Sequence, residues 1–233
     1  MGKAVLIGSH KNEIGKTIIC IKMGVNLSEN GKKVLLIDLS EGKNKMSAYL
    51  NVNEDIIYDI KDVLDSTCSP EQAIIDINEN LFLLPCPRVA GKLGSIKMEE
   101  FDKLINEVKD IYDVIITDID KISSSYIDFN LIDNIISINC NDFSCIKELN
   151  RDKHIAEKFN VEIISVLNKY DRKNAKKGIM LNIKEVEKMT EMEMNVVIDE
   201  NTKYSGVDYD FLFSNEDDTF NKAIKSLSEK LLQ

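Results

Sequence analysis

The 233-residue sequence lacks the features of an exported, membrane-spanning or linker-rich protein. It has no apolar run of about 18 residues, the length of a transmembrane helix, and no apolar secretory segment at its N-terminus. Only three prolines occur, and no repeat, low-complexity tract or flexible linker divides the chain. We therefore expect a cytoplasmic location and one domain over residues 1–233, which is long enough to bury a core.

The cysteines follow no disulfide or metal-binding pattern. There are five, an odd number, and no Cys-x-x-Cys pair occurs. This argues against a disulfide framework and against a conventional zinc site, because both need defined sets of thiols. We expect reduced, mostly buried thiols and assign no redox or cluster role to Cys140 and Cys145, which flank a predicted loop. The remaining cysteines are Cys20, Cys68 and Cys86.

Basic residues are fewer than acidic residues in this sequence. Lys and Arg total 30 against 40 Asp and Glu, which gives a net charge of −10. Such a field repels a polyanion unless the basic residues gather on one face. Nonspecific DNA binding is therefore disfavoured.

Short apolar runs rich in Val and Ile alternate with amphipathic segments along the chain. Continuous hydrophobicity is typical of strands that are buried on both faces, and the alternation predicts a parallel sheet with helices on both sides. The expected strands are 4–7, 34–37, 81–84, 114–117, 135–138, 163–167 and 196–198. The expected helices are 15–29, with Gly31 as its C-terminal cap, 98–109, 143–159 and 183–190.

A phosphate-binding loop is predicted where the first strand ends, in the segment VLIGSHKNEIGKTIIC. A loop that leaves a strand and enters a helix at Gly15-Lys16-Thr17 can direct backbone N–H groups and a positive helix end at a phosphate. Lys16 would then reach the β- and γ-phosphates, and the Thr17 hydroxyl would hold Mg²⁺. The alternative is an ordinary helix N-terminus, in which Lys16 and Thr17 have no phosphate-binding role.

This segment resembles the deviant Walker A motif of the MinD/ParA family of ATPases, written S-G-K-G-G-V-G-K-T. Further along, VLLIDLSEGKNKMS resembles the family's switch I, YDVIITDID its Walker B strand, and VLNKYDRKNAKKG its adenine-side strand end. The likeness covers nearly the whole chain in the same order, roughly residues 1–225, which makes it far more specific than any one motif.

The resemblance implies a three-layer α/β/α P-loop fold that binds ATP or ADP with Mg²⁺. It makes Lys11 the signature lysine, which in this family contacts the nucleotide of a dimer partner. Asp38 and Asp118 would lie at the metal together with Thr17, and Asn168 and Asp199 would lie beside the adenine. The residues that would line the phosphates are Lys11, Asn12, Glu13, Ile14, Gly15, Lys16, Thr17 and Ile18.

The sequence also departs from the family pattern. His10, Asn12 and Glu13 replace loop glycines, which accept positive φ and let the backbone approach a phosphate. Glu13 adds negative charge near phosphates unless it pairs with Lys11 or points to solvent. Ser40 stands where relatives have an aspartate that orients the hydrolytic water, and a serine cannot act as a carboxylate base.

Other positions keep open alternatives. One alternative is that Asp120 replaces the missing carboxylate, and Ile198 occupies the family's proline position. Lys11 could instead be a solvated loop lysine, Asp118 a strand-end carboxylate and Asn168 a turn residue.

Three functions follow as hypotheses. The first is a nucleotide-gated dimerising switch that positions a division site, flagellum or pilus through unknown protein partners, with catalysis resting on Lys11, Lys16 and Asp38. The second is a pseudo-ATPase scaffold, and the third is a partition ATPase that acts on DNA. The C-terminal segment, with Phe220, Ile224, Leu227 and Leu231 on one stripe, is expected to be a packing helix rather than a membrane anchor.

Overall fold

The computed structural model describes residues 1–9, 11, 13–40, 45–89, 91–94, 96–201 and 209–233. Within these residues one eight-stranded sheet has the order β3-β4-β2-β5-β1-β6-β7-β8. Neighbouring strands pair in parallel, apart from the antiparallel pair β3 and β4. The strands are β1 Lys3–Gly8, β2 Val34–Leu39, β3 Ile75–Asp76, β4 Leu81–Leu84, β5 Val114–Ile119, β6 Asn134–Asn139, β7 Glu162–Tyr170 and β8 Val196–Asp199.

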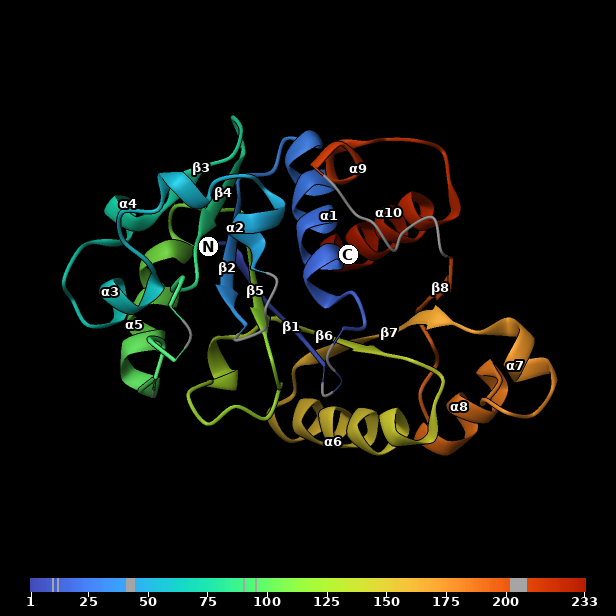
Figure 1. Ribbon diagram of the computed structural model, residues 1–233. Coiled ribbons are helices and arrows are strands. Elements are labelled where there is room, and N and C mark those ends of the chain that lie inside the picture. Colours follow the sequence, from blue (N-terminus) through green and yellow to red (C-terminus); the bar gives the residue numbers. More distant parts are fainter. Residues whose placement is uncertain (10, 12, 41–44, 90, 95, 202–208) are drawn as a thin grey trace.

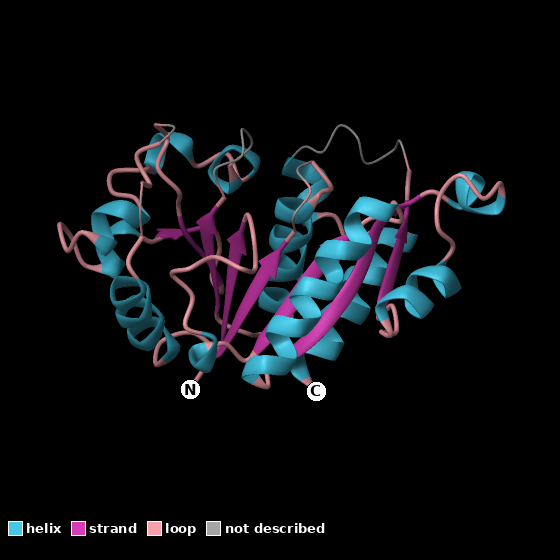
Figure 2. Cartoon of the chain, turned by 90° about the horizontal axis from the view of Figure 1, so that it is seen from below, coloured by secondary structure: helices cyan, strands magenta, loops and turns pink. Residues whose placement is uncertain are grey.

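Helices cover both faces of this sheet (Figures 1 and 2). Helices α1, α9 and α10 lie on one side, whereas α6 lies on the other. The predicted three-layer fold with a mostly parallel sheet is therefore confirmed. The α-helices are α1 Lys16–Glu29, α2 Met46–Tyr49, α3 Ile60–Leu64, α4 Pro70–Ala73, α5 Met98–Lys109, α6 Phe143–Phe159, α7 Arg172–Lys176, α8 Ile183–Thr190, α9 Tyr209–Phe213 and α10 Thr219–Leu232; η1 Asn53–Asp55 and η2 Phe129–Leu131 are short 3₁₀ turns.

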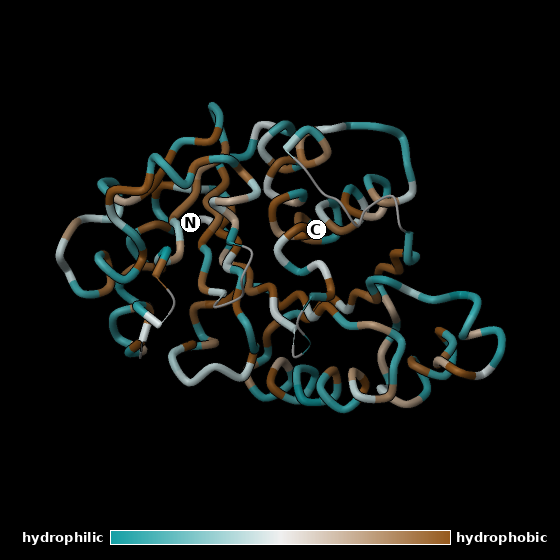
Figure 3. The backbone as a smooth tube through the Cα atoms, viewed as in Figure 1, coloured by the Kyte–Doolittle hydropathy of each residue, from teal (hydrophilic) through white to brown (hydrophobic). Residues whose placement is uncertain are grey.

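Alternate residues of each buried strand enter opposite halves of the core. In β1, Val5 and Ile7 pack with α1 and α10, whereas Ala4 and Leu6 pack with α5. The period of two positions inside an unbroken apolar run is the expected geometry of a strand that is covered on both faces. Figure 3 shows the result as hydrophobic strands inside a more hydrophilic outer path of loops.

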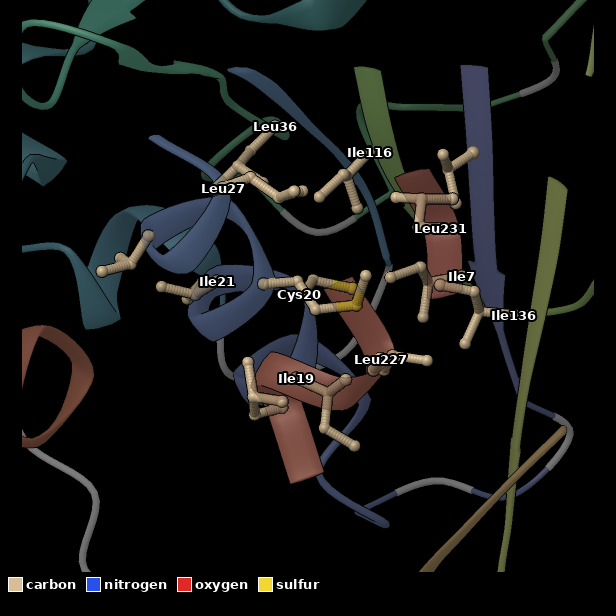
Figure 4. Packing of buried hydrophobic residues seen from close by; sticks show 14 of the residues in the cluster. Ile7, Ile19, Cys20, Ile21, Leu27, Leu36, Ile116, Ile136, Leu227 and Leu231 are labelled. Atoms are coloured by element: carbon tan, nitrogen blue, oxygen red, sulfur yellow. The ribbon is translucent and has the colours of Figure 1, made fainter. Parts of the chain in front are cut away.

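Helix α1 is buried on most of its surface. The segment was predicted to be amphipathic, and this prediction is wrong, because α9 and α10 pack against the helix in addition to the sheet. Figure 4 shows Ile19 and Cys20 of α1 beside Ile7 of β1 and Leu227 of α10. The predicted cap is confirmed: Gly31 has a φ of 78° and donates to Ser28 O, while Lys32 donates to Leu27 O.

Helix α10 is a packing helix, as predicted. Its stripe of Phe220, Ile224, Leu227 and Leu231 is buried, and the aromatic ring of Phe220 lies 5.7 Å from that of Phe211 in α9. Among the described residues, no helix combines the length and the apolar character that crossing a membrane requires.

Candidate functional site

The predicted phosphate loop leaves β1 in the interior of the sheet, between β5 and β6. In the parallel register Ile7 lies opposite Asp118, and Asp118 lies opposite Asp38. The loop and both carboxylates therefore share the carboxyl edge of three adjacent strands. Ligands of open α/β sheets collect at this edge.

Gly15 sets the direction in which α1 begins. Its φ of 84° lies in the left-handed region, and a Cβ at this position would lie 2.8 Å from Asn168 Nδ2. Asn168, which is buried, donates from Nδ2 to Ile14 O at 2.6 Å. Glycine is thus required both for its conformation and for this close approach.

The N-terminus of α1 presents backbone donors to the loop. The first hydrogen bond of the helix runs from Ile19 N to Gly15 O at 3.1 Å. The N–H groups of residues 15–18 precede this bond, so they have no intrahelical acceptor. Such donors, together with the positive end of the helix, form an anion site.

Lys16 and Thr17 converge on Asp118. Thr17 Oγ1 donates to Asp118 Oδ2 at 2.7 Å, and Lys16 Nζ lies 3.2 Å from Asp118 Oδ1. Lys16 also donates to Ile119 O at 2.6 Å and lies 3.4 Å from Asp120 Oδ1. Burial lowers the pKa of Lys16, but Asp118 and Asp120 outweigh it, so the net pKa is raised and the ammonium stays charged.

Asp118 and Asp38 form a buried acidic pair. Burial raises the pKa of Asp118 to about 6; Lys16 opposes this rise and Asp38 adds to it. Burial also raises the pKa of Asp38. Two neighbouring carboxylates with so little solvent favour a cation beside them.

Asp38 is held in place by hydrogen bonds from residues that follow it in the chain. Its Oδ1 accepts from Ser40 N at 3.0 Å and from Ser40 Oγ at 2.9 Å, while Oδ2 accepts from Met46 N at 2.9 Å. The Ser40 hydroxyl is therefore committed to orienting Asp38. Between these two residues and α2, the segment 41–44 lies outside the described residues.

The donor set fits Mg²⁺, a hard cation that prefers oxygen ligands. Asp118 Oδ1 is buried and has no donor in hydrogen-bonding geometry among the described residues, although the Lys16 ammonium is nearby. The Thr17 hydroxyl is in contact with the same carboxylate. Asp38 has both oxygens engaged by backbone or hydroxyl donors, which suits a contact through metal-bound water.

Lys11 is held within its own chain. Its ammonium forms an ion pair with Asp142 Oδ2 and lies 3.5 Å from Cys140 Sγ, while its side chain remains 48% exposed. The hydrogen bond with Asp142 raises the pKa of Lys11. Asp142 had no place in the predicted site; the sequence signal for it is its position just before α6, where an aspartate caps a helix.

Glu13 and Asn168 take up positions that the sequence left open. Glu13 has a φ of 60° and is exposed, so its carboxylate can be solvated. Its carbonyl accepts from Lys169 Nζ at 2.6 Å. Lys169 and Asn168, at the irregular end of β7, therefore clamp two successive carbonyls of the loop, and the role of Lys169 was not predicted.

The remaining predicted residues are not all gathered at the loop. Asp199 ends β8, which is separated from β1 by β6 and β7, and it accepts from Arg172 Nε at 2.7 Å. Ile14 is buried and Ile18 is partly buried behind the loop. His10 and Asn12 lie outside the described residues.

Comparison with known proteins places these features in a family. A family model described as an AAA domain matches residues 2–160, more than half of the chain. The chain is 26% identical to the septum site-determining protein MinD of Thermotoga maritima over 209 residues, which cover 85% of this chain and 75% of that protein. It is 30% identical to MinD of Bacillus subtilis over 121 residues, 51% of this chain and 45% of that protein. The match thus spans less than half the length of the latter relative.

A solved structure extends the likeness to the whole fold. The MinC:MinD cell division protein complex of Aquifex aeolicus contains a chain with a TM-score of 0.82 and 25% identity. The superposition covers 99% of this chain and 96% of that one.

Proposed function

Because this chain belongs to the MinD/ParA family of P-loop ATPases, we propose that it is a nucleotide-gated dimerising switch with weak or lost hydrolysis. It would bind ATP or ADP with Mg²⁺ and position a cellular structure, such as a division site, flagellum or pilus, through protein partners. The observation that supports this most is the contact of Lys16 and Thr17 with buried Asp118 beside the glycine turn.

Phosphate binding would use groups that already converge. The N–H groups of residues 15–18 would donate to phosphate oxygens, and Lys16 would move from Ile119 O and Asp120 to the β- and γ-phosphates. Thr17 would ligate Mg²⁺, with Asp38 and Asp118 holding its water shell. The exposed position of Glu13 removes much of its repulsion of phosphate.

Hydrolysis would be weak because Ser40, which replaces the catalytic aspartate, is already hydrogen-bonded to Asp38. Ser40 donates both its N–H and its hydroxyl to Asp38. A hydroxyl used in this way neither orients a water molecule strongly nor takes up its proton. Lys11 and Lys16 would still stabilise phosphate charge, so binding and turnover are separable.

Lys11 would act across a dimer interface. In the single chain it is paired with Asp142, at a side-chain exposure of 48% that leaves the ammonium within reach of another molecule. We propose that a nucleotide held by the partner exchanges with Asp142 as the anion that Lys11 binds.

A pseudo-ATPase scaffold is the second candidate, and one observation favours it. The Lys16 ammonium and the Thr17 hydroxyl already have partners within the chain, so the folded loop does not need a nucleotide to satisfy them. In that case the fold alone would present a binding surface to a partner protein.

Calorimetry and light scattering distinguish the two candidates. We expect Mg-ATP to bind the wild type, and Lys16→Ala to bind at least about 100-fold more weakly, since it loses a charged contact to phosphate. Lys225→Ala, an exposed lysine on α10, serves as the matched control and should bind normally. ATP should raise the mass of the wild type to that of a dimer, and Lys11→Glu should bind ATP but remain monomeric.

Two other results would contradict the nucleotide-gated dimerising switch. Absence of heat with millimolar Mg-ATP and Mg-ADP would leave only the scaffold. An ATP-bound wild type that stays monomeric would remove the dimerising switch but keep the nucleotide site.

A further inference from the structure

Two cysteines and an aspartate converge where β6 passes into α6. Cys140 follows the last residue of β6, and Cys145 lies in the first turn of α6. Their sulfur atoms are 3.0 Å apart, although five positions separate them in the chain. With one carboxylate oxygen of Asp142, these sulfurs form a set of three ligand atoms that all lie within 4.8 Å of one another.

Asp142 is oriented toward the sulfurs by its role in capping α6. Its Oδ1 accepts from Cys145 N at 3.0 Å and from the Ser144 hydroxyl. The other oxygen, Oδ2, is thereby turned to the opposite side, where it lies 3.4 Å from Cys140 Sγ. The helix cap thus fixes the carboxylate without using the oxygen that faces the thiols.

A cation already occupies the edge of this cluster. The ammonium of Lys11 forms an ion pair with Asp142 Oδ2 and lies 3.5 Å from Cys140 Sγ. Both of these atoms belong to the set of three ligand atoms. The chain's own side chain therefore shows that the cluster attracts positive charge.

We propose that Cys140, Asp142 and Cys145 form a binding site for a soft divalent cation, with Zn²⁺ as the fitting ion. Two thiolates and one carboxylate are ligands that Zn²⁺ accepts in four-coordinate sites, and thiolates discriminate against Mg²⁺ and Ca²⁺. Three protein ligands leave a fourth position for water or another ligand. Binding releases the two thiol protons, so that three negative charges surround the ion.

The metal and Lys11 compete for the same atoms. An ion held by Asp142 Oδ2 and Cys140 Sγ displaces the ammonium from both contacts. The site therefore couples metal binding to the release of Lys11 from its own chain, whether or not a nucleotide binds. The absence of a Cys-x-x-Cys motif hid this site in the sequence, because a helix turn rather than a tight loop brings the two thiols together.

Titration of the reduced, full-length protein with Co²⁺ under anaerobic conditions tests the proposal. We expect one equivalent to produce thiolate-to-cobalt charge transfer and the visible bands of a tetrahedral ion, and Zn²⁺ to abolish them. Cys140→Ser and Cys145→Ser should lose the bands. Cys68→Ser, which removes a partly exposed thiol elsewhere, is the matched control and should keep them.

Two further measurements do not depend on the folding of the serine variants. Lys11→Ala removes the competing ammonium at an exposed position, so it should bind Zn²⁺ about tenfold more tightly, the change expected for about 1.4 kcal/mol. In the wild type, Zn²⁺ should protect Cys140 and Cys145, but not Cys68, from alkylation measured by mass spectrometry.

Several results would overturn the proposal. One is a reduced protein that gives no cobalt bands. A protein whose two thiols form a disulfide in air but give no cobalt bands when reduced would count in the same way. Others are bands that persist in both serine variants, an affinity for Zn²⁺ that is unchanged in Lys11→Ala, and alkylation of the pair that Zn²⁺ does not slow.

Discussion

At the scale of single residues, Gly15 is the position where an added methyl group should lower both stability and nucleotide affinity. Its φ of 84° and the 2.8 Å approach to Asn168 Nδ2 both oppose a Cβ. We expect Gly15→Ala to lower the stability by roughly 1–2 kcal/mol from the left-handed conformation alone and to move the loop carbonyl that Asn168 holds. Thermal unfolding and Mg-ATP calorimetry should both record a loss.

Gly31→Ala is the control for that substitution. Gly31 has a similar φ of 78°, but nothing lies within 4 Å of a Cβ built there. It should lose the same roughly 1–2 kcal/mol of stability from the left-handed conformation and keep the nucleotide affinity of the wild type. Equal effects of the two substitutions on affinity would show that loop strain does not govern binding.

The site residues divide according to how local their interactions are. Lys16, Thr17 and Gly15 could be placed from the sequence, because a strand, a glycine turn and a helix start fix them within a few positions. The pairing of Lys11 with Asp142 spans 131 positions, and that of Asn168 with Ile14 spans 154. Such contacts depend on which strands become neighbours, so residue pattern alone could not reveal them.

At the scale of elements, α5 contains a carboxylate that should cost stability. Asp102 Oδ1 is buried and has no hydrogen-bond partner among the described residues. Burial raises the pKa of Asp102, and the charges of Asp128 and Glu99 add to the rise. A carboxyl group whose folded pKa is raised destabilises the protein above that pKa, and the cost disappears as the pH falls below it.

Asp102→Asn should therefore raise the melting temperature at pH 7. We expect a gain of about 1 kcal/mol, or about 2–4 °C, that shrinks as the pH approaches about 4. Differential scanning calorimetry across this range is the measurement, and Glu107→Gln, an exposed position on the same helix, should change little. A gain that is independent of pH would assign the effect to packing instead of charge.

Truncation of a buried leucine in α10 should show how much the packing of this helix against α1 contributes to stability. Leu227 is fully buried against α1, whereas Leu232 in the last turn is 42% exposed. Leu227→Ala should cost about 2–5 kcal/mol, and Leu232→Ala less than about 1 kcal/mol, in denaturant unfolding. Similar small losses for both would mean that α10 detaches from α1 in solution.

Long elements were more predictable than short ones. Helices 98–109, 143–159 and 183–190 have the predicted bounds, because two or more turns define each. Strand 81–84 also has the predicted bounds although it is only four residues long, because it is a continuous apolar run. The strand β3, of two residues, and helices such as α2 and α4, of four, were not predicted. Segments this short contain no readable period, and caps and neighbouring strands determine them.

At the scale of the whole molecule, the alternation of apolar runs and amphipathic segments was sufficient to predict the fold class. The total charge of the chain should govern how two copies associate. Each chain has a net charge of −10, so two chains repel each other at long range. The proposed contact of Lys11 with a partner's phosphate acts at short range and in a partly desolvated place. Salt should therefore weaken the repulsion more than the attraction.

We expect the ATP-bound dimer to tighten as ionic strength rises. From about 0.01 M to 0.15 M salt the screening length falls from about 30 Å to about 8 Å, which removes most of the repulsion between the two acidic bodies. Sedimentation equilibrium with Mg-ATP should give a dissociation constant that falls several-fold over this range. Lys11→Glu, which replaces a positive charge with a negative one and so lowers the net charge of each chain by two units, should remain monomeric throughout. A dimer that loosens with salt would mean that exposed ion pairs across the interface, rather than the balance of total charge, control assembly.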